Sequence, residues 1–418
     1  MKNLKFSLII LLVLAPIWLA AQDPSNTSFG DNAGDGGTGF DNTFIGRFSG
    51  FENTTGNSNT FLGNFSGREN TTGYSNTFIG ADAGNKNTVG YQNTFLGTFS
   101  GRENNGSDNT FLGAFSGLFN TTGNSNTFIG SFSGYRNTTG FFNTFLGTSS
   151  GQNNTTGGGN LFLGAFSGQN NTAGSGNLFL GASSGRENTT GGGNLFFGNF
   201  AGFSNTTGEL NTFLGVSSGQ DNISGTKNVY LGNFTGTRNT DGERNIFIGY
   251  GAVFNEQGSN KLYIHNDSLG IPLIYGDFAV GGMGINTTSL SDGATQYALS
   301  VNGKIRANDD IITYSGWADY VFEDDYELKT LEEVESFIQK NKHLPDVPTA
   351  KEIEERGNNL GATDEMLLRK VEELTLYMIK QHKTNQAQAA HIAKQEKQMI
   401  KQDKRIEQLE KELTKLKK

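Results

Sequence analysis

The residues that could carry out acid–base chemistry are few and scattered along the chain. Only four histidines occur among the 418 residues. His343 and Asp346 lie three residues apart in the segment KHLPDVP, a spacing that could hold an acid–base pair. Two prolines in the same segment make a turn between helices the simpler interpretation. His382 and His391 fall in a strongly polar stretch and are expected to be solvated.

Carboxylate, metal and phosphate chemistry also find no suitable pattern. Glycoside hydrolysis needs paired carboxylates, whereas acidic residues such as Glu52, Glu69 and Glu103 occupy variable positions and form no inward set. Calcium-binding solenoids repeat an aspartate, and none recurs here. The GxxSG segments lack the lysine of a phosphate-binding loop. We therefore expect no enzymatic activity, no metal and no cofactor.

Threonine columns suggest a different kind of surface chemistry. A threonine follows the asparagine in most copies of the motif NTF[IL]G. Regularly spaced threonines on a flat solenoid could order water and bind ice. The column changes to Leu161, Leu178 and Leu195 in later copies, which weakens this alternative.

These residues belong to a repeat that must position them. With the asparagine of NTF[IL]G as position one, copies begin at Asn42, Asn59, Asn76, Asn93, Asn109, Asn126, Asn143, Asn160, Asn177, Asn194, Asn211, Asn228 and Asn245. Every step is 17 residues except the 16 from Asn93 to Asn109, and an irregular copy begins at Asn26. Short fixed periods predict a solenoid, in which each coil buries its apolar face against its neighbours.

Two apolar columns run through this repeat. Position three is Phe in all copies but one, where it is Tyr230, and position four is Ile or Leu except at Phe197. Neighbouring residues of a strand point to opposite faces. If Phe61 points inward, Leu62 points outward, and a strand that is apolar on both sides is buried on both sides. Since the repeat offers no helix as a cover, we expect the outward column to meet another copy of the chain.

The small and polar positions fit the corners of a narrow coil. Glycines at positions five, nine and fifteen, such as Gly63, Gly67 and Gly73, would permit left-handed or otherwise tight corners. A small residue at position eight, Ser66 here, lets backbones approach. Asn70 at position twelve suits a left-handed corner and a ladder of asparagines along the axis. Seventeen residues would fit a coil with two brief strands.

Composition and the N-terminus indicate an exported, ordered protein. The hydrophobic fraction of 34% is low, but 33 phenylalanines oppose disorder. A net charge of -9 gives no electrostatic footprint for nucleic acid. Residues 1–21 resemble a secretory signal peptide, with two lysines, an apolar run and a cleavage site near Ala21 and Gln22. An N-terminal membrane anchor is the alternative, and we expect no transmembrane segment in the mature chain.

The C-terminal third changes in character. Alternating residues, among them Leu262, Ile264, Tyr275, Phe278 and Val280, predict short strands. Two capping boxes, TLEE from residue 330 and TAKE from residue 349, predict two short helices, the second ending at a glycine.

The last segment has the spacing of a coiled coil. Apolar or amide residues alternate at steps of four and three from Leu367 to Leu416. With Val371 at position a, the a residues are Val, Met, Asn, Ile, Met, Ile and Leu, and four consecutive d residues are glutamine. Polar core layers fix register, and isoleucine at a without leucine at d favours three strands over two.

The expected protein is therefore mainly β. Residues 1–21 form the signal peptide, 22–258 a β-solenoid head of about 14 repeats and 259–322 a β-rich neck. A small helical module at 323–363 and a coiled coil at 364–418 follow. We expect a homo-oligomer, a trimer in preference to a dimer, secreted or at the cell surface. Variable exposed aromatics could meet a glycan or an extracellular protein, and the candidates are Tyr74, Tyr91, Tyr135, Phe141 and Phe142.

Two resemblances fit this organisation. The NTF[IL]GxxSG repeats resemble the head repeats of YadA-like trimeric adhesins, which implies trimeric β-rolls. The run YALSVNGKIRA to LLRKVEELTLYMIKQ resembles a tail-fibre-like C-terminal module of exported Bacteroidetes-type proteins. No membrane barrel and no self-cleavage motif follow, so autotransport and autoproteolysis are not implied. The resemblances imply an adhesive or structural fibre; the alternatives are an ice-binding solenoid and a phage-tail-fibre-like glycan-binding protein.

Overall fold

The computed structural model describes residues 25–253, 256–308 and 317–416. It divides into two compact units, with the boundary between Ile305 and Arg306. The predicted signal peptide, residues 1–21, lies outside the described residues. In the part of the chain that is described, no helix has the length and apolar character needed to cross a bilayer.

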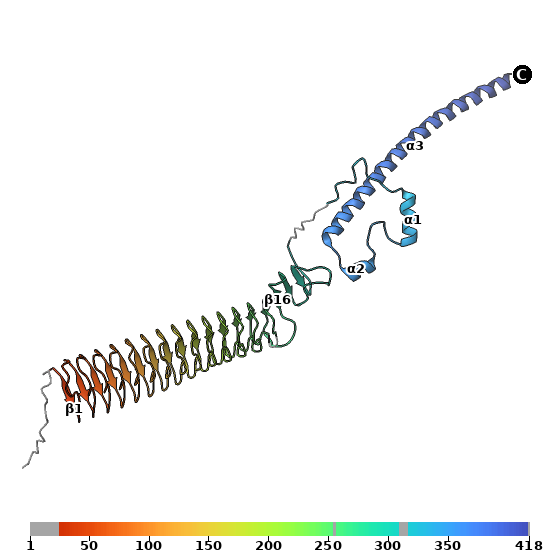
Figure 1. Ribbon diagram of the computed structural model, residues 1–418. Coiled ribbons are helices and arrows are strands. Elements are labelled where there is room, and N and C mark those ends of the chain that lie inside the picture. The colour runs from red at the N-terminus through yellow and green to blue at the C-terminus, as the bar shows by residue number, and fades with distance from the viewer. Residues whose placement is uncertain (1–24, 254–255, 309–316, 417–418) are drawn as a thin grey trace, which may run out of the picture. The chain divides into compact units, whose positions relative to one another are not determined.

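The first unit contains a parallel β-solenoid, as the repeat predicts (Figure 1). Each coil contributes one three-residue strand that pairs in parallel with the strands before and after it. These strands are β1 Thr27–Phe29, β2 Thr43–Ile45, β3 Thr60–Leu62, β4 Thr77–Ile79, β5 Thr94–Leu96, β6 Thr110–Leu112, β7 Thr127–Ile129, β8 Thr144–Leu146, β9 Leu161–Leu163, β10 Leu178–Leu180, β11 Leu195–Phe197, β12 Thr212–Leu214, β13 Val229–Leu231 and β14 Ile246–Ile248. The prediction of two strands per coil is wrong, because the rest of each coil turns too tightly to form a second one.

The register keeps equivalent residues aligned. Thr60 pairs with Thr77, and Phe61 with Phe78, so each residue type forms a column along the solenoid axis. The 16-residue step leaves this register intact, since Thr94 still pairs with Thr110. The missing residue is taken from the turn at Asn105, where other copies have two residues before the glycine.

A single file of aromatic rings fills the solenoid. The ring of Phe61 is fully buried, and from this residue to Phe247 the rings stack with centroids 4.7–4.9 Å apart and planes within 2–9° of parallel. Offset aromatic pairs contribute about 0.5–1.5 kcal/mol each beyond the area they bury. The interior is one ring wide, which explains why position three accepts only Phe or Tyr.

Two asparagine columns flank the rings. Asn76 Nδ2 and its backbone N–H both donate to Asn59 Oδ1, at 3.1 and 3.0 Å. At position twelve, Asn87 Nδ2 donates to Asn70 Oδ1 and to the Gly90 carbonyl. The predicted ladder is therefore confirmed. The expected left-handed backbone at position twelve is wrong, because these asparagines are needed for their amides and not for a corner.

The repeat requires glycine for two different reasons. Gly63 and Gly67 have φ of 142° and 55°, so the expected corners are confirmed there. Gly73 has no positive φ, which corrects the expectation for position fifteen. A Cβ at Gly73 would lie 2.4 Å from the Gly90 carbonyl oxygen, so close packing between coils requires glycine there. The small residue Ser66 donates its hydroxyl to the Phe78 carbonyl of the next coil.

The first unit ends in four further strands. Strand β15, Lys261–Ile264, continues the parallel stack on β14, and β16, Ile274–Asp277, and β17, Gly282–Ile285, pair antiparallel after it. Strand β18, Leu299–Val301, is parallel to β17. Phe278 and Val280, expected in strands, lie in the turn between β16 and β17.

The second unit contains three helices: α1 Leu331–Asn341, α2 Ala350–Arg356 and α3 Leu360–Leu416. Thr330 and Thr349 cap α1 and α2 with the predicted capping boxes, and Gly357 ends α2. The 57-residue α3 carries the predicted heptad residues, and Figure 1 shows its length against the two short helices.

Candidate interaction surfaces

The outward column of the solenoid is an apolar stripe. Phe61 is fully buried, while the side chain next to it, Leu62, is 42% exposed. The same alternation recurs in every strand from β2 to β14. The stripe is therefore a row of apolar side chains, aliphatic except at Phe197, that faces away from the solenoid interior, as the period of two predicts.

The threonine column borders this stripe. Thr60 and Thr94 are exposed, and none of the position-two hydroxyls donates to or accepts from another described residue. By contrast, Thr71 at position thirteen donates its hydroxyl to the Thr88 carbonyl, so its polar group is used within the solenoid. The position-two column therefore offers free hydroxyls next to the stripe.

A third column was not anticipated from the sequence. Position seven is left-handed in every full coil, and it often carries phenylalanine: Phe65 has φ of 57° and Phe115 has φ of 61°. The rings of Phe99, Phe115 and Phe132 stack on the outer surface with centroids 5.3 and 5.0 Å apart. Their faces cover each other, so only ring edges meet solvent. The signal for this column was the recurrence of Phe before the small residue at position eight.

Arginines accompany the outer phenylalanines. The Arg47 guanidinium lies 4.9 Å from the centroid of Phe48, and that of Arg102 lies 5.7 Å from Phe99. Cation–π contacts at exposed sites contribute about 0.5–1 kcal/mol. This edge of the solenoid is therefore mixed in character, aromatic and cationic.

The predicted ligand-binding aromatics fall into three separate groups. Tyr74 and Tyr91 are exposed and stack at 4.9 Å. Phe141 and Phe142 are exposed neighbours with their rings at 77°. Tyr135 is half-buried against Phe119 and Phe132 instead of facing a ligand. These residues do not form one site.

The second unit has a groove beside the start of α3. Its volume is about 530 Å³. Leu331 and Val334 of α1 line one side, and Leu367, Val371 and Leu374 of α3 line the other.

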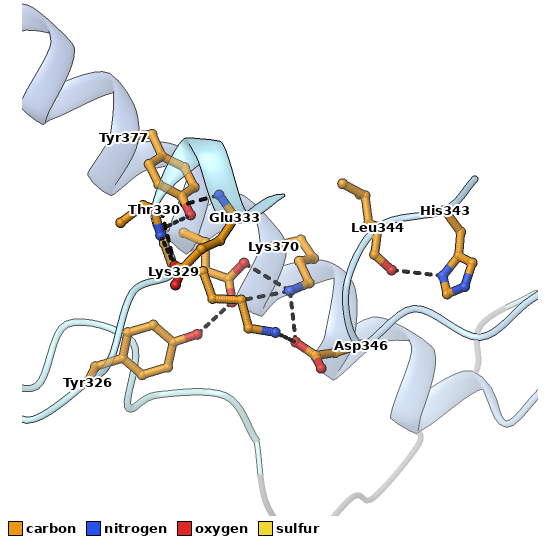
Figure 2. A network of polar contacts seen from close by, with 10 residues as sticks. Tyr326, Lys329, Thr330, Glu333, His343, Leu344, Asp346, Lys370 and Tyr377 are labelled. Carbon is orange, nitrogen blue, oxygen red and sulfur yellow. Dashed lines mark hydrogen bonds and ion pairs between the residues drawn. The ribbon is translucent and has the colours of Figure 1, made fainter. Parts of the chain in front are cut away.

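A polar network fixes one edge of this groove (Figure 2). Lys370 Nζ contacts Glu373 at 2.9 Å and Asp346 at 3.5 Å, and Asp346 also pairs with Lys329. Tyr326 donates a hydrogen bond to Glu373. Burial of the Tyr326 hydroxyl and, to a smaller extent, this hydrogen bond raise the pKa of Tyr326. Tyr377 donates to the Lys329 carbonyl. The network ties the chain before α1 to α3.

The suggested acid–base pair is not assembled. The His343 ring nitrogen Nδ1 lies 2.9 Å from the Leu344 carbonyl, and Asp346 turns to the two lysines (Figure 2). Burial alone would raise the pKa of Asp346, but the hydrogen bond and charge of Lys329 and the charge of Lys370 outweigh it and lower the pKa. A carboxylate held in this way is a structural ion and a poor base. Across the described residues, no group of three or more His, Asp or Glu could hold a metal ion.

Beyond the groove, α3 exposes an unpartnered seam. The heptad residues Met378 and Ile392 are exposed, as are Met399, Ile406, Leu409 and Leu413. An exposed apolar stripe of this length marks an interaction surface.

Comparison with protein-family models and with curated proteins found no match for this chain.

Proposed function

We propose that this protein is an exported structural or adhesive fibre, built as a homotrimer. In this proposal the signal peptide at 1–21 is removed near Ala21 and Gln22. The β-solenoid is the head, and α3 is a coiled-coil segment that holds three copies together at the cell surface or in the secreted protein. The head then meets a surface outside the cell.

The aliphatic stripe on the solenoid is the observation that carries this proposal. A fully buried Leu or Ile is stabilised by about 1.5–3 kcal/mol relative to an exposed one. The stripe repeats one such residue, like Leu62, in each coil. An exposed apolar patch of this extent marks an interaction site, and a partner with the same repeat would match it coil for coil.

The seam of α3 supports the same stoichiometry. Its a and d residues need partners, and glutamines at four successive d positions from Gln381 to Gln402 can hydrogen-bond across a core of equivalent helices. Isoleucine at a without leucine at the middle d positions favours three helices over two.

Adhesion is proposed because the variable positions of the coils carry the exposed aromatics. Tyr74 with Tyr91, and Phe141 with Phe142, offer surface groups for a glycan or an extracellular protein. Screening the purified chain on glycan arrays and matrix proteins, with Tyr74→Ala/Tyr91→Ala as the comparison, tests this part.

Sedimentation equilibrium of residues 22–418 tests the assembly. We expect a mass of three chains at micromolar concentration. A monodisperse monomer would overturn the proposal, and a stable dimer would overturn its stoichiometry. Leu163→Glu/Leu180→Glu on the stripe should weaken association of the head, whereas Thr190→Glu at an exposed turn should not.

A second candidate, ice binding, is favoured by the free hydroxyls of Thr60, Thr77 and Thr94 beside a regular aliphatic column. A thermal-hysteresis assay tests this candidate. If the protein shows thermal hysteresis that is lost in Thr77→Leu/Thr94→Leu, ice binding would replace adhesion as the proposed function.

A further inference from the structure

We propose that the groove beside α3 receives the α3 helix of a second copy of this chain, so that α1 of each copy clamps its neighbour. This inference rests on the homotrimer proposed above, and it assigns a role to α1 and to the loop that follows it.

The second unit lacks a core of its own. Among its described residues only Ala318, Val321, Pro345 and Gly361 are buried, and neither α1 nor α2 buries a single residue. A unit of about a hundred residues ordinarily buries well over half of the surface of its unfolded chain. We therefore infer that another chain covers the apolar side chains of this unit.

The contacts that the segments before and after α1 make with α3 leave the seam open. With Val371 at position a, the polar contacts of Figure 2 fall on Lys370 and Tyr377 at g and on Glu373 at c. The groove instead exposes Val371 at a and Leu374 at d. The segment around α1 thus lies along one edge of the seam and adds a wall to it.

The polar groups at the rim are already satisfied. Lys370 is largely shielded and contacts two carboxylates, and Asp346 contacts two lysines. No charged ligand is needed to neutralise them. What remains open is an apolar surface of Leu331, Val334, Leu344 and the two seam residues.

Charge complementarity along α3 identifies the occupant as another α3 in parallel. In a parallel pair, a g residue faces the e residue five positions later on the partner. This places Arg405 opposite Glu410. An antiparallel pair would instead set the e residues Glu396, Asp403 and Glu410 against one another.

The same register brings an apolar e residue to the groove. The e positions are polar or small along α3 except for Leu368, which lies level with the groove. A neighbour aligned in parallel presents its Leu368 and Val371 at this height, where Val334 and Leu331 form the wall. The seam is continuous from the groove to Leu416, so one helix can occupy both.

The chain has no cysteine, which permits a direct test by disulfide trapping. Two differently tagged single-cysteine chains, Val334→Cys and Leu368→Cys, are co-expressed and mildly oxidised. We expect a disulfide between the two tags. In the matched control, Ser336→Cys takes the place of Val334→Cys. Ser336 lies on the opposite side of α1, and serine is similar in size to the cysteine that replaces it. We expect at least ten-fold less cross-linked product from this control.

Two further readouts separate this inference from the proposed oligomer. Met378→Cys, on the seam C-terminal to the groove, should form a disulfide between copies whenever their α3 helices associate. In the intact oligomer, the Val334→Cys thiol should be protected from a bulky thiol reagent, and the Ser336→Cys thiol should react.

The clamp would be overturned, and the oligomer kept, if Met378→Cys cross-links the copies but Val334→Cys and Leu368→Cys form no disulfide. The same holds if Met378→Cys cross-links the copies but the Val334→Cys thiol reacts with the reagent. In that case the groove serves another ligand. A monomer with no cross-link at either site would overturn both. Unchanged helicity by circular dichroism confirms that each variant is folded.

Discussion

Gly168 lies directly against the ring of Phe162 in the same coil. A Cβ added at Gly168 would stand 2.4 Å from Phe162 Cε2, and φ of 55° already places this residue in the left-handed region. The interior of the solenoid is thus closed on one side by a backbone without a side chain.

Gly168→Ala should lower the free energy of unfolding by about 3 kcal/mol, combining the left-handed backbone with an overpacked ring. Gly159→Ala is the matched control, because Gly159 has φ of 67° but open space around it. Gly159→Ala should lower the free energy of unfolding by only about 1 kcal/mol. Denaturant unfolding followed by circular dichroism measures both, and equal losses would contradict the role of ring contact.

The asparagine ladder leads to a pH-dependent prediction. Asn171 Nδ2 donates to Asn154 Oδ1 and to the Gly174 carbonyl, and its own Oδ1 accepts from Asn188. Asn171→Asp keeps the shape but sets a carboxylate against two acceptor oxygens. We expect a loss of about 3 kcal/mol at pH 7.

The sign of the pH effect follows from burial. The introduced carboxyl should have a raised pKa, since burial and the two oxygens disfavour its charged form. Its cost is therefore full at pH above that pKa and falls as acid restores a donor. Asn199→Asp is the control, because the exposed Asn199 uses only its oxygen as an acceptor for Ala182 N–H. A loss in Asn171→Asp that does not change with pH would refute this account.

Tyr230 is the one tyrosine in the inner column. Its hydroxyl is buried, makes no hydrogen bond of normal geometry with a described residue, and has its pKa raised by that burial. Tyr230→Phe should therefore stabilise the solenoid by about 1 kcal/mol. Tyr263→Phe should do the opposite, because Tyr263 donates to Glu256 at 2.8 Å. Thermal melts of the two variants should shift in opposite directions.

Acid should loosen α1. The pKa of Asp346 is lowered by Lys329 and Lys370 against the effect of burial, so the carboxylate stabilises the fold above the ordinary value near 4. That contribution is lost as pH falls through the lowered pKa. Amide exchange in α1, relative to the intrinsic exchange rate, should thus accelerate as the pH falls below about 4 through the lowered pKa. In Asp346→Asn the acceleration should be smaller, and an unchanged profile would rule Asp346 out as its source.

Much of the solenoid could be predicted because its signals are periodic. Strand geometry sets Phe61 and Leu62 on opposite faces, and the expected arrangement with Phe61 inside and Leu62 outside is confirmed. The asparagine ladder followed from the same in-register stacking. The capping boxes at Thr330 and Thr349 are local, so they too were visible in the sequence.

What the sequence could not reveal depends on contacts between coils. Phe65 and Ser75 adopt left-handed backbones that their residue types do not favour. The neighbouring coil imposes them, since Phe65 N–H donates to the Arg47 carbonyl and Ser75 N–H to Asn57. The groove beside α3 was likewise invisible, because Tyr326 and Glu373 are 47 residues apart.

The asparagine columns also give the solenoid an electrical direction. Asn76 donates to Asn59 and Asn87 to Asn70, so along these two columns the side-chain amides point their N–H groups toward β1 and their oxygens toward β15. The exception is Asn239 in the last full coil, whose amide donates to the Glu256 carbonyl instead. Aligned dipoles add and polarise one another. The two ends of the first column are therefore used differently: Asn26 Nδ2 donates to the Gly39 carbonyl at the β1 end, and Asn245 Oδ1 accepts from Lys261 N–H at the β15 end. A further coil could extend such a column only if its asparagine amide pointed the same way.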